Sequence, residues 1–205
     1  MARHFENHFV EKLSEPKLEQ TLNEAAVQLS RIDVVRELPV RNQQAIFDMA
    51  NFMICSANEI ILSGDDWREN YWGLYIVGSR ATGQTHSASD LDMLSVGTFY
   101  SNLRFPELWG RSSWPKVFEG FEVEMPDELP DQYNLGEVDR KYLLRAAPQS
   151  EGVLPIDLNV VDMTFDDSVG LDDFLVDRDV DNAGEQLPRI PLVELIIEAD
   201  RFIQF

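Results

Sequence analysis

The most informative part of the sequence runs from Tyr71 to Val96 and reads YWGLYIVGSRATGQTHSASDLDMLSV. Its first part, Leu74 to Val77, is a short run of β-branched and aromatic residues, which is typical of a buried strand. Gly78 and Ser79 end that run, and a mostly small or polar spacer follows them. A second strand-like segment, Asp90 to Val96, comes after the spacer. The order predicts two strands joined by a turn and a loop.

Two carboxylates stand one residue apart in the second segment. Side chains of a strand alternate between faces with a period of two, so Asp90 and Asp92 are expected to project to one face. Leu91 and Met93 are expected on the other face. Two neighbouring carboxylates repel each other strongly unless a cation lies between them. Since oxygen-only ligands suit magnesium, the pattern predicts a site for Mg²⁺ or Mn²⁺.

Gly78-Ser79, the spacer from Arg80 to Ser89 and the acidic–apolar–acidic triplet that begins at Asp90 follow one another in a familiar order. Together they resemble the signature of the DNA polymerase beta-type nucleotidyltransferase superfamily, and its small members in particular. The resemblance is confined to this stretch. It implies an α/β (α+β) fold, with a mixed central β-sheet flanked by helices. It also implies transfer of a nucleoside monophosphate from a nucleoside triphosphate, with ATP as the expected donor.

A third strand-like segment, Pro155 to Val161, carries another carboxylate. Its alternation places Asp157 on one face and the apolar Ile156 and Leu158 on the other. An aspartate inside such an apolar run is expensive to bury unless it is paired or bound to a metal. The resemblance implies a third catalytic carboxylate on a strand beside the acidic triplet, and Asp157 is the residue expected there. Asp162, on the opposite face, is the weaker choice.

The resemblance also implies roles for the residues around the turn. Gly78 would let the backbone approach the phosphates closely, and Ser79 would donate its hydroxyl and backbone N–H to them. Arg80 and Ser89, at the two ends of the spacer, are expected to contact the nucleotide. For Gly78 and Ser79 taken alone, a plain turn stays open as the alternative.

The densest basic patch of the chain lies between Val138 and Ala146 and contains Arg140, Lys141 and Arg145. One interpretation is a helix or strand with a solvated face. The other is neutralisation of the triphosphate near the metal site, for which Lys141 is the predicted nucleotide-binding residue.

Apolar spacing predicts the remaining elements. Residues Phe5–Leu38 and Arg41–Leu62 have apolar positions at intervals of three and four and predict helices. Phe121–Met125 alternates apolar and acidic residues and predicts a half-exposed strand. Pro188–Phe205 shows one apolar face at helical spacing, so a terminal helix is expected.

These elements suggest three parts of one chain. Residues 1–66 form a helical region packed on the core, residues 67–165 form the catalytic core, and residues 166–205 form an acidic loop and the terminal helix of the same domain. Within the first part, His4 and His8 would share a helix face. The glutamate between them does not follow the first histidine, so this is not the zinc-protease motif. A solvent-exposed terminus is the favoured interpretation, and a metal role is the alternative.

Composition limits the classes of partner. The 205 residues include 37 acidic and 17 basic side chains, for a net charge of −20. Such a surface repels phosphate backbones, which argues against a broad nucleic-acid-binding face. No apolar run approaches the roughly 20 residues that span a bilayer. The single cysteine, Cys55, cannot form an internal disulfide, and this fits a reducing, cytoplasmic setting.

Two further functions stay open beside nucleotidyl transfer to a small-molecule hydroxyl or a protein side chain. The acidic surface could serve a basic protein partner, so that the fold acts as a non-catalytic or antitoxin-like binding module, or it could reflect a high-salt source. The motif could also be a chance pattern in a structural acidic protein. The intact set of three aspartates favours chemistry, because a purely binding protein has no physical need for mutually repelling carboxylates.

Overall fold

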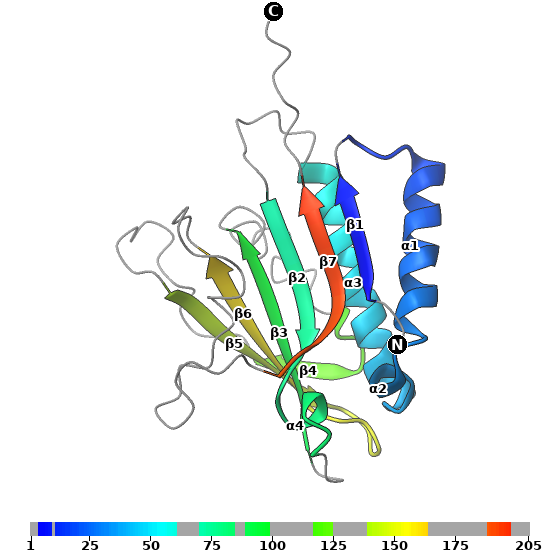
Figure 1. Ribbon diagram of the computed structural model, residues 1–205. Helices are drawn as coiled ribbons and strands as arrows, with labels where there is room; N and C mark the ends of the chain where they lie inside the picture. The colour runs from blue at the N-terminus through cyan, green and yellow to red at the C-terminus, as the bar shows by residue number, and fades with distance from the viewer. Residues whose placement is uncertain are drawn as a thin grey trace, which may run out of the picture.

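A computed structural model describes residues 4–9, 11–60, 70–84, 89–98, 117–124, 139–163 and 188–197. Within these ranges the chain forms a seven-stranded mixed sheet with helices packed against it, as Figure 1 shows. The expected mixture of helices and a mixed sheet is therefore confirmed. The acidic segment that follows Thr164 lies outside the described residues.

The sheet mixes parallel and antiparallel neighbours. Across it the strands stand in the order β1 (Phe5–Phe9), β7 (Ile190–Ile197), β2 (Asn70–Ile76), β3 (Leu91–Thr98), β6 (Ile156–Met163), β5 (Asp139–Pro148) and β4 (Phe121–Glu124). Strand β1 runs parallel to β7, and β3 runs parallel to β6. The other neighbouring pairs are antiparallel. Both ends of the chain therefore contribute to the sheet that carries the predicted site.

Helices cover one face of the sheet. They are α1 (Glu15–Leu29), α2 (Asp33–Arg36) and α3 (Val40–Ile60). A separate short helix, α4 (Gly78–Ala81), connects β2 to β3. In Figure 1, α3 passes behind β7 and β1. Its apolar stripe, including Ile46, Met49 and Met53, is fully buried. The Phe52 ring packs edge-on against Trp72 of β2, with ring centroids 6.3 Å apart. This face holds the hydrophobic core.

The opposite face of the sheet, called the second face below, receives the alternate residues of each strand. Trp72, Leu74 and Ile76 of β2 belong to the core with α3, so Tyr71, Gly73 and Tyr75 project from the second face. The same alternation in β3 places Leu91 and Met93 in the core and Asp92 on the second face. Whatever chemistry the aspartates perform takes place on the side of the sheet away from α3.

The structure corrects the sequence prediction at both ends of the chain. Residues Phe5–Phe9, predicted as part of a helix, form the strand β1, whose two phenylalanines are buried while Glu6 is exposed. Residues Ile190–Ile197, predicted as part of a helix, form β7. The apolar spacing of that segment is explained by burial between two neighbouring strands rather than by one helix face. Residues 198–205 lie outside the described part.

The other predicted elements are found close to their expected bounds. The helix predicted from Arg41 is α3, and the two strands of the opening stretch are β2 and β3. The alternating acidic segment is β4, the basic patch lies in β5, and the strand around Asp157 is β6. Cys55 lies in α3 as a free thiol, and burial raises its pKa. No helix in the described ranges is both long and apolar enough to cross a membrane.

Candidate functional site

The turn between β2 and α4 packs directly against Asp92. The backbone N–H of Val77 donates to the Asp92 carbonyl oxygen at 3.0 Å. The next residue, Gly78, has a φ of +67°, a conformation that residues with a side chain rarely adopt. A Cβ at Gly78 would lie 2.3 Å from Asp92 Oδ2. Glycine is therefore required at position 78 for two reasons. Its positive φ strains any other residue, and a side chain there would collide with the Asp92 carboxylate.

Strands β3 and β6 bring two of the predicted aspartates together. Asp92 and Asp157 are register partners on these parallel strands, so both side chains leave the sheet on the second face. The backbone N–H of Leu91 donates to the Pro155 carbonyl at 2.8 Å, which aligns the starts of the two strands. Asp90 precedes β3 and is exposed. The resemblance implied that Asp157 lies on a strand beside that of Asp92, and the pairing of β3 with β6 confirms that the two strands are neighbours.

A buried amide in α3 holds the start of β6. Asn42 is fully buried, its Nδ2 donates to the Leu154 carbonyl at 2.8 Å, and its Oδ1 accepts from the Leu154 N–H at 3.0 Å. A side-chain amide that satisfies both backbone groups of one residue replaces a strand partner. Asn42 thus fixes the segment that leads to Asp157. Sequence reasoning missed it, because one polar residue at the start of a helix carries no pattern.

The electrostatics of this group are repulsive. The pKa of Asp92 is raised above its ordinary value of 3.8, first by burial and then by the charges of Asp157 and Asp90, while Arg80 acts in the opposite direction. Asp92 therefore feels the charge of both neighbours even though Asp90 is outside the strand. A cation placed among them would relieve this repulsion.

Two arginines approach the aspartates. Arg80, in α4, donates from Nη2 to the Ser89 carbonyl at 3.2 Å, and its Nε is buried without a hydrogen-bond partner among the described residues. Ser89 itself is buried. Arg145 of β5 is the register partner of Asp157, and its Nε lies 4.0 Å from Asp157 Oδ2. Since the Arg145 side chain is 63% exposed, this contact adds little stability.

Some of the predicted phosphate ligands lie next to the aspartates and one lies further along the sheet. Gly78 and Ser79 open α4 beside Asp92. Lys141 lies in β5 opposite Val161, four residues along β6 from Asp157, and its side chain is outside the described part. The basic residue that the register brings to Asp157 is Arg145. The sequence placed Arg145 in the basic patch with Lys141, but only the pairing of β5 with β6 shows that Arg145 is the one opposite Asp157.

The three aspartates are neighbours without forming one closed coordination sphere. Among the described residues, the group whose ligand atoms all lie within 4.8 Å of one another is His4, Glu6 and Glu194. The aspartate oxygens are more widely spaced than that. The sequence offered a metal role for His4 only together with His8, and it gave no sign of Glu194, which comes from the opposite end of the chain.

Comparisons with protein-family models, with curated proteins and with solved structures return no match for this chain. The resemblance to the nucleotidyltransferase superfamily therefore rests on the residues from Gly78 to Asp92 and on Asp157.

Proposed function

We propose that this chain is a metal-dependent nucleotidyltransferase that transfers a nucleoside monophosphate from a nucleoside triphosphate to a hydroxyl group. One observation carries the proposal. Asp92 and Asp157 are register partners on adjacent parallel strands, and a glycine turn that tolerates no side chain packs against Asp92. A Gly-Ser turn, an acidic pair and a third carboxylate in the next strand are the parts that the resemblance requires.

The residues fit magnesium or manganese. Asp90, Asp92 and Asp157 offer only oxygen ligands, which these ions prefer. Burial raises the pKa of Asp92 first, and the charges of Asp157 and Asp90 raise it further; a divalent cation bound there would neutralise that negative charge. Bound by these carboxylates, the metal would neutralise the triphosphate and lower the pKa of the attacking hydroxyl.

The surrounding side chains have separate tasks. Gly78 and Ser79 present backbone N–H groups to the phosphates at the start of α4. Arg80 supplies positive charge next to Asp92, and its buried, unpartnered Nε is a cost of the kind retained at functional sites. Arg145 supplies positive charge beside Asp157. Ser89 anchors Arg80 through its backbone carbonyl.

The proposed transfer is a single displacement at the α-phosphorus of the nucleotide. The acceptor oxygen forms a bond to the α-phosphorus, and the bond from that phosphorus to the oxygen bridging to the β-phosphorus breaks. Pyrophosphate leaves with the electron pair of the broken bond. The hydroxyl proton passes to Asp157, the carboxylate opposite Asp92 in the register.

The test is pyrophosphate release from ATP, GTP, CTP and UTP with Mg²⁺ or Mn²⁺, using small hydroxyl compounds and proteins as acceptors. Asp92→Asn keeps the shape of the side chain and removes its charge. Since losing an outer partner of a metal site already costs about 10–100-fold, we expect this variant to lose at least about 100-fold in rate. Asp33→Asn is the matched control, because Asp33 is an exposed residue of α2. Failure of the wild type with all four nucleotides, or full activity of Asp92→Asn, contradicts the proposal.

A second candidate, a module that binds a basic protein, is favoured by the net charge of −20. The same variant separates the two functions. Asp92→Asn removes one charge of many, so binding to a basic partner would survive it while nucleotidyl transfer would not.

A further inference from the structure

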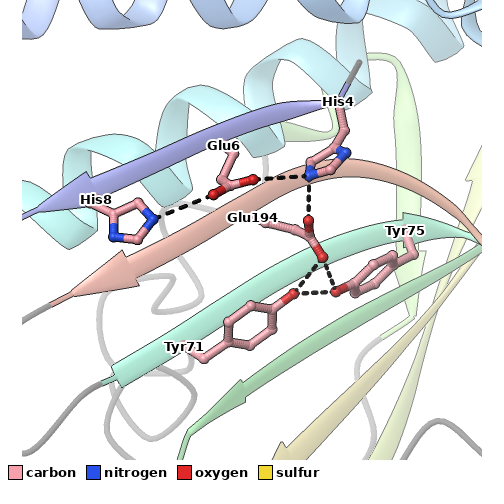
Figure 2. A network of polar contacts seen from close by, with 6 residues as sticks. All are labelled: His4, Glu6, His8, Tyr71, Tyr75 and Glu194. Carbon is pink, nitrogen blue, oxygen red and sulfur yellow. Dashed lines mark hydrogen bonds and ion pairs between the residues drawn. The ribbon is translucent and has the colours of Figure 1, made fainter. Parts of the chain in front are cut away.

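A second group of polar side chains lies on the second face, away from the aspartates. Figure 2 shows His4, Glu6 and His8 on β1 or at its start, Glu194 on β7, and Tyr71 and Tyr75 on β2. Glu6 and Glu194 are register partners on the parallel pair β1 and β7, and Glu194 stands opposite Gly73 of β2. The name histidine–glutamate cluster is used below for His4, Glu6 and Glu194.

One nitrogen and two carboxylates meet at the centre of this cluster. His4 Nε2 contacts Glu194 Oε2 and lies 3.7 Å from Glu6 Oε2. Although it is close to both, Nε2 is buried and has no hydrogen-bond partner among the described residues. His4 Nε2 is in ion-pair contact with both glutamates. The ligand atoms of the three residues all lie within 4.8 Å of one another, which is close enough for them to bind one metal cation.

The far oxygen of each carboxylate is already held. Glu194 Oε1 accepts hydrogen bonds from the Tyr71 hydroxyl at 2.9 Å and from the Tyr75 hydroxyl at 2.8 Å. Glu6 Oε1 accepts from His8 Nε2 at 3.3 Å. In both glutamates the oxygen that remains is Oε2, the one turned toward His4. Such outer hydrogen bonds orient the ligands of metal sites.

Gly73 makes room for this arrangement. A Cβ there would lie 2.6 Å from the Tyr75 ring and 2.7 Å from both tyrosine hydroxyls. Burial raises the pKa of Tyr71 and of Tyr75, so both hydroxyls keep their protons and act as donors to Glu194.

We propose that His4, Glu6 and Glu194 bind a divalent transition-metal ion of the zinc class. One imidazole nitrogen with two carboxylate oxygens is a ligand set that Zn²⁺ accepts, whereas Mg²⁺ and Ca²⁺ prefer oxygen alone. Three protein ligands leave a fourth position for water or a further ligand. The ion fastens β1, at the edge of the sheet, to β7.

The site is independent of the proposed nucleotidyl transfer. Glu194 stands opposite Gly73, and Asp92 bonds to Val77 on the far side of β2. Gly73 and Val77 are four residues apart along the chain, and β7 and β3 are two strand spacings apart. The backbones of Glu194 and Asp92 are therefore about 16 Å apart. The two metal sites can therefore be tested separately.

The first experiment titrates the metal-free full-length chain with Zn²⁺ alone, followed by calorimetry. We expect one tight equivalent in the wild type, unaffected by excess Mg²⁺ and unaffected by Asp92→Asn. His4→Ala should weaken that equivalent by at least about 100-fold, and Glu194→Gln should do the same while keeping acceptors for the tyrosines. His8→Ala is the matched control on the same strand, and it should weaken binding no more than about tenfold because His8 holds only the outer oxygen of Glu6.

A second measurement guards against variants that fail to fold. The chain has three histidines, so the imidazole nitrogen signals of the wild type can be assigned by NMR. Zinc should shift His4 Nε2 far more than the nitrogens of His8 or His86. Absence of a tight equivalent, an equal loss in His4→Ala and His8→Ala, or a zinc shift outside His4 overturns the proposal. None of these results bears on pyrophosphate release.

Discussion

The second face of the sheet carries two acidic groups that handle their charge in opposite ways. Burial and the charges of Asp157 and Asp90 raise the pKa of Asp92, and the exposed Arg145 lies 4.0 Å from Asp157. In the histidine–glutamate cluster each glutamate has one oxygen held by a hydrogen bond from a tyrosine or histidine. The first group is left with repulsion that a bound cation and phosphates can relieve, whereas the second is oriented in advance. A site for turnover and a site for a resident ion are expected to differ in this way.

Both groups also depend on a glycine, and the largest expected effect comes from Gly78. Gly78→Ala places a Cβ 2.3 Å from Asp92 Oδ2 and strains a φ of +67°. Gly83→Ala is the matched control, since its φ is +72° but nothing lies within 4 Å of the added Cβ. We expect Gly83→Ala to cost about 1–2 kcal/mol in the free energy of unfolding, and Gly78→Ala about 1–3 kcal/mol more.

Urea unfolding of the two variants measures this difference, and pyrophosphate release measures its consequence for the site. Because the added carbon displaces the Asp92 carboxylate, Gly78→Ala should also lose pyrophosphate release, while Gly83→Ala should keep most of it. Equal stabilities and equal activities of the two variants would show that the turn is an ordinary one.

A smaller effect is expected at the glycine of the other group. Gly73→Ala pushes the rings of Tyr71 and Tyr75 away from Glu194, but these are the ends of side chains and can move. We expect a loss of about 1 kcal/mol in the free energy of unfolding, since crowding is partly offset by the better strand propensity of alanine. Zinc affinity should fall about tenfold or more, because Glu194 loses its outer hydrogen bonds.

Calorimetry of Gly73→Ala beside Tyr71→Phe checks this prediction. Tyr71→Phe removes one donor without crowding the strand, so its effect on zinc affinity should have the same sign and a smaller size. A Gly73→Ala chain that binds zinc as tightly as the wild type would mean that the tyrosines do not orient Glu194.

The contrast between the two groups also explains what sequence reasoning could find. The pair Asp90 and Asp92 lies within one short segment, where the period of a strand and the preceding Gly-Ser turn are visible without a structure. The alternation shows that Asp157 lies in a second strand-like segment, but only the resemblance implied that this strand lies beside the acidic pair. His4, Glu6 and Glu194 meet only through the parallel pairing of β1 with β7, and both strands were predicted as helices. Long-range strand pairing leaves no local pattern, so this group stayed hidden.

The smallest expected effect concerns pH, and it tests whether burial and the neighbouring carboxylates make the ionised Asp92 destabilising. The pKa of Asp92 is higher in the folded chain than its ordinary value of 3.8, so the folded state binds a proton more readily than the unfolded state. Ionising Asp92 therefore costs stability at neutral pH, and the wild type regains it as the pH falls through the raised pKa. Asp92→Asn has no such charge. In metal-free buffer at neutral pH it should melt higher than the wild type, by no more than about 2–4 °C, since partly exposed charges are worth at most about 1 kcal/mol.

The difference in melting temperature should shrink as the pH falls through the raised pKa and vanish below 3.8, because the wild-type carboxyl is then protonated in both states. Magnesium should reverse its sign at neutral pH, since only the wild type keeps the full set of carboxylates to bind the ion. Zinc should raise both melting temperatures equally, because the histidine–glutamate cluster is unchanged in the variant. A variant that melts below the wild type in metal-free buffer would show that Asp92 is stabilising. The aspartates would then resemble the histidine–glutamate cluster, and the comparison between the two groups would fail.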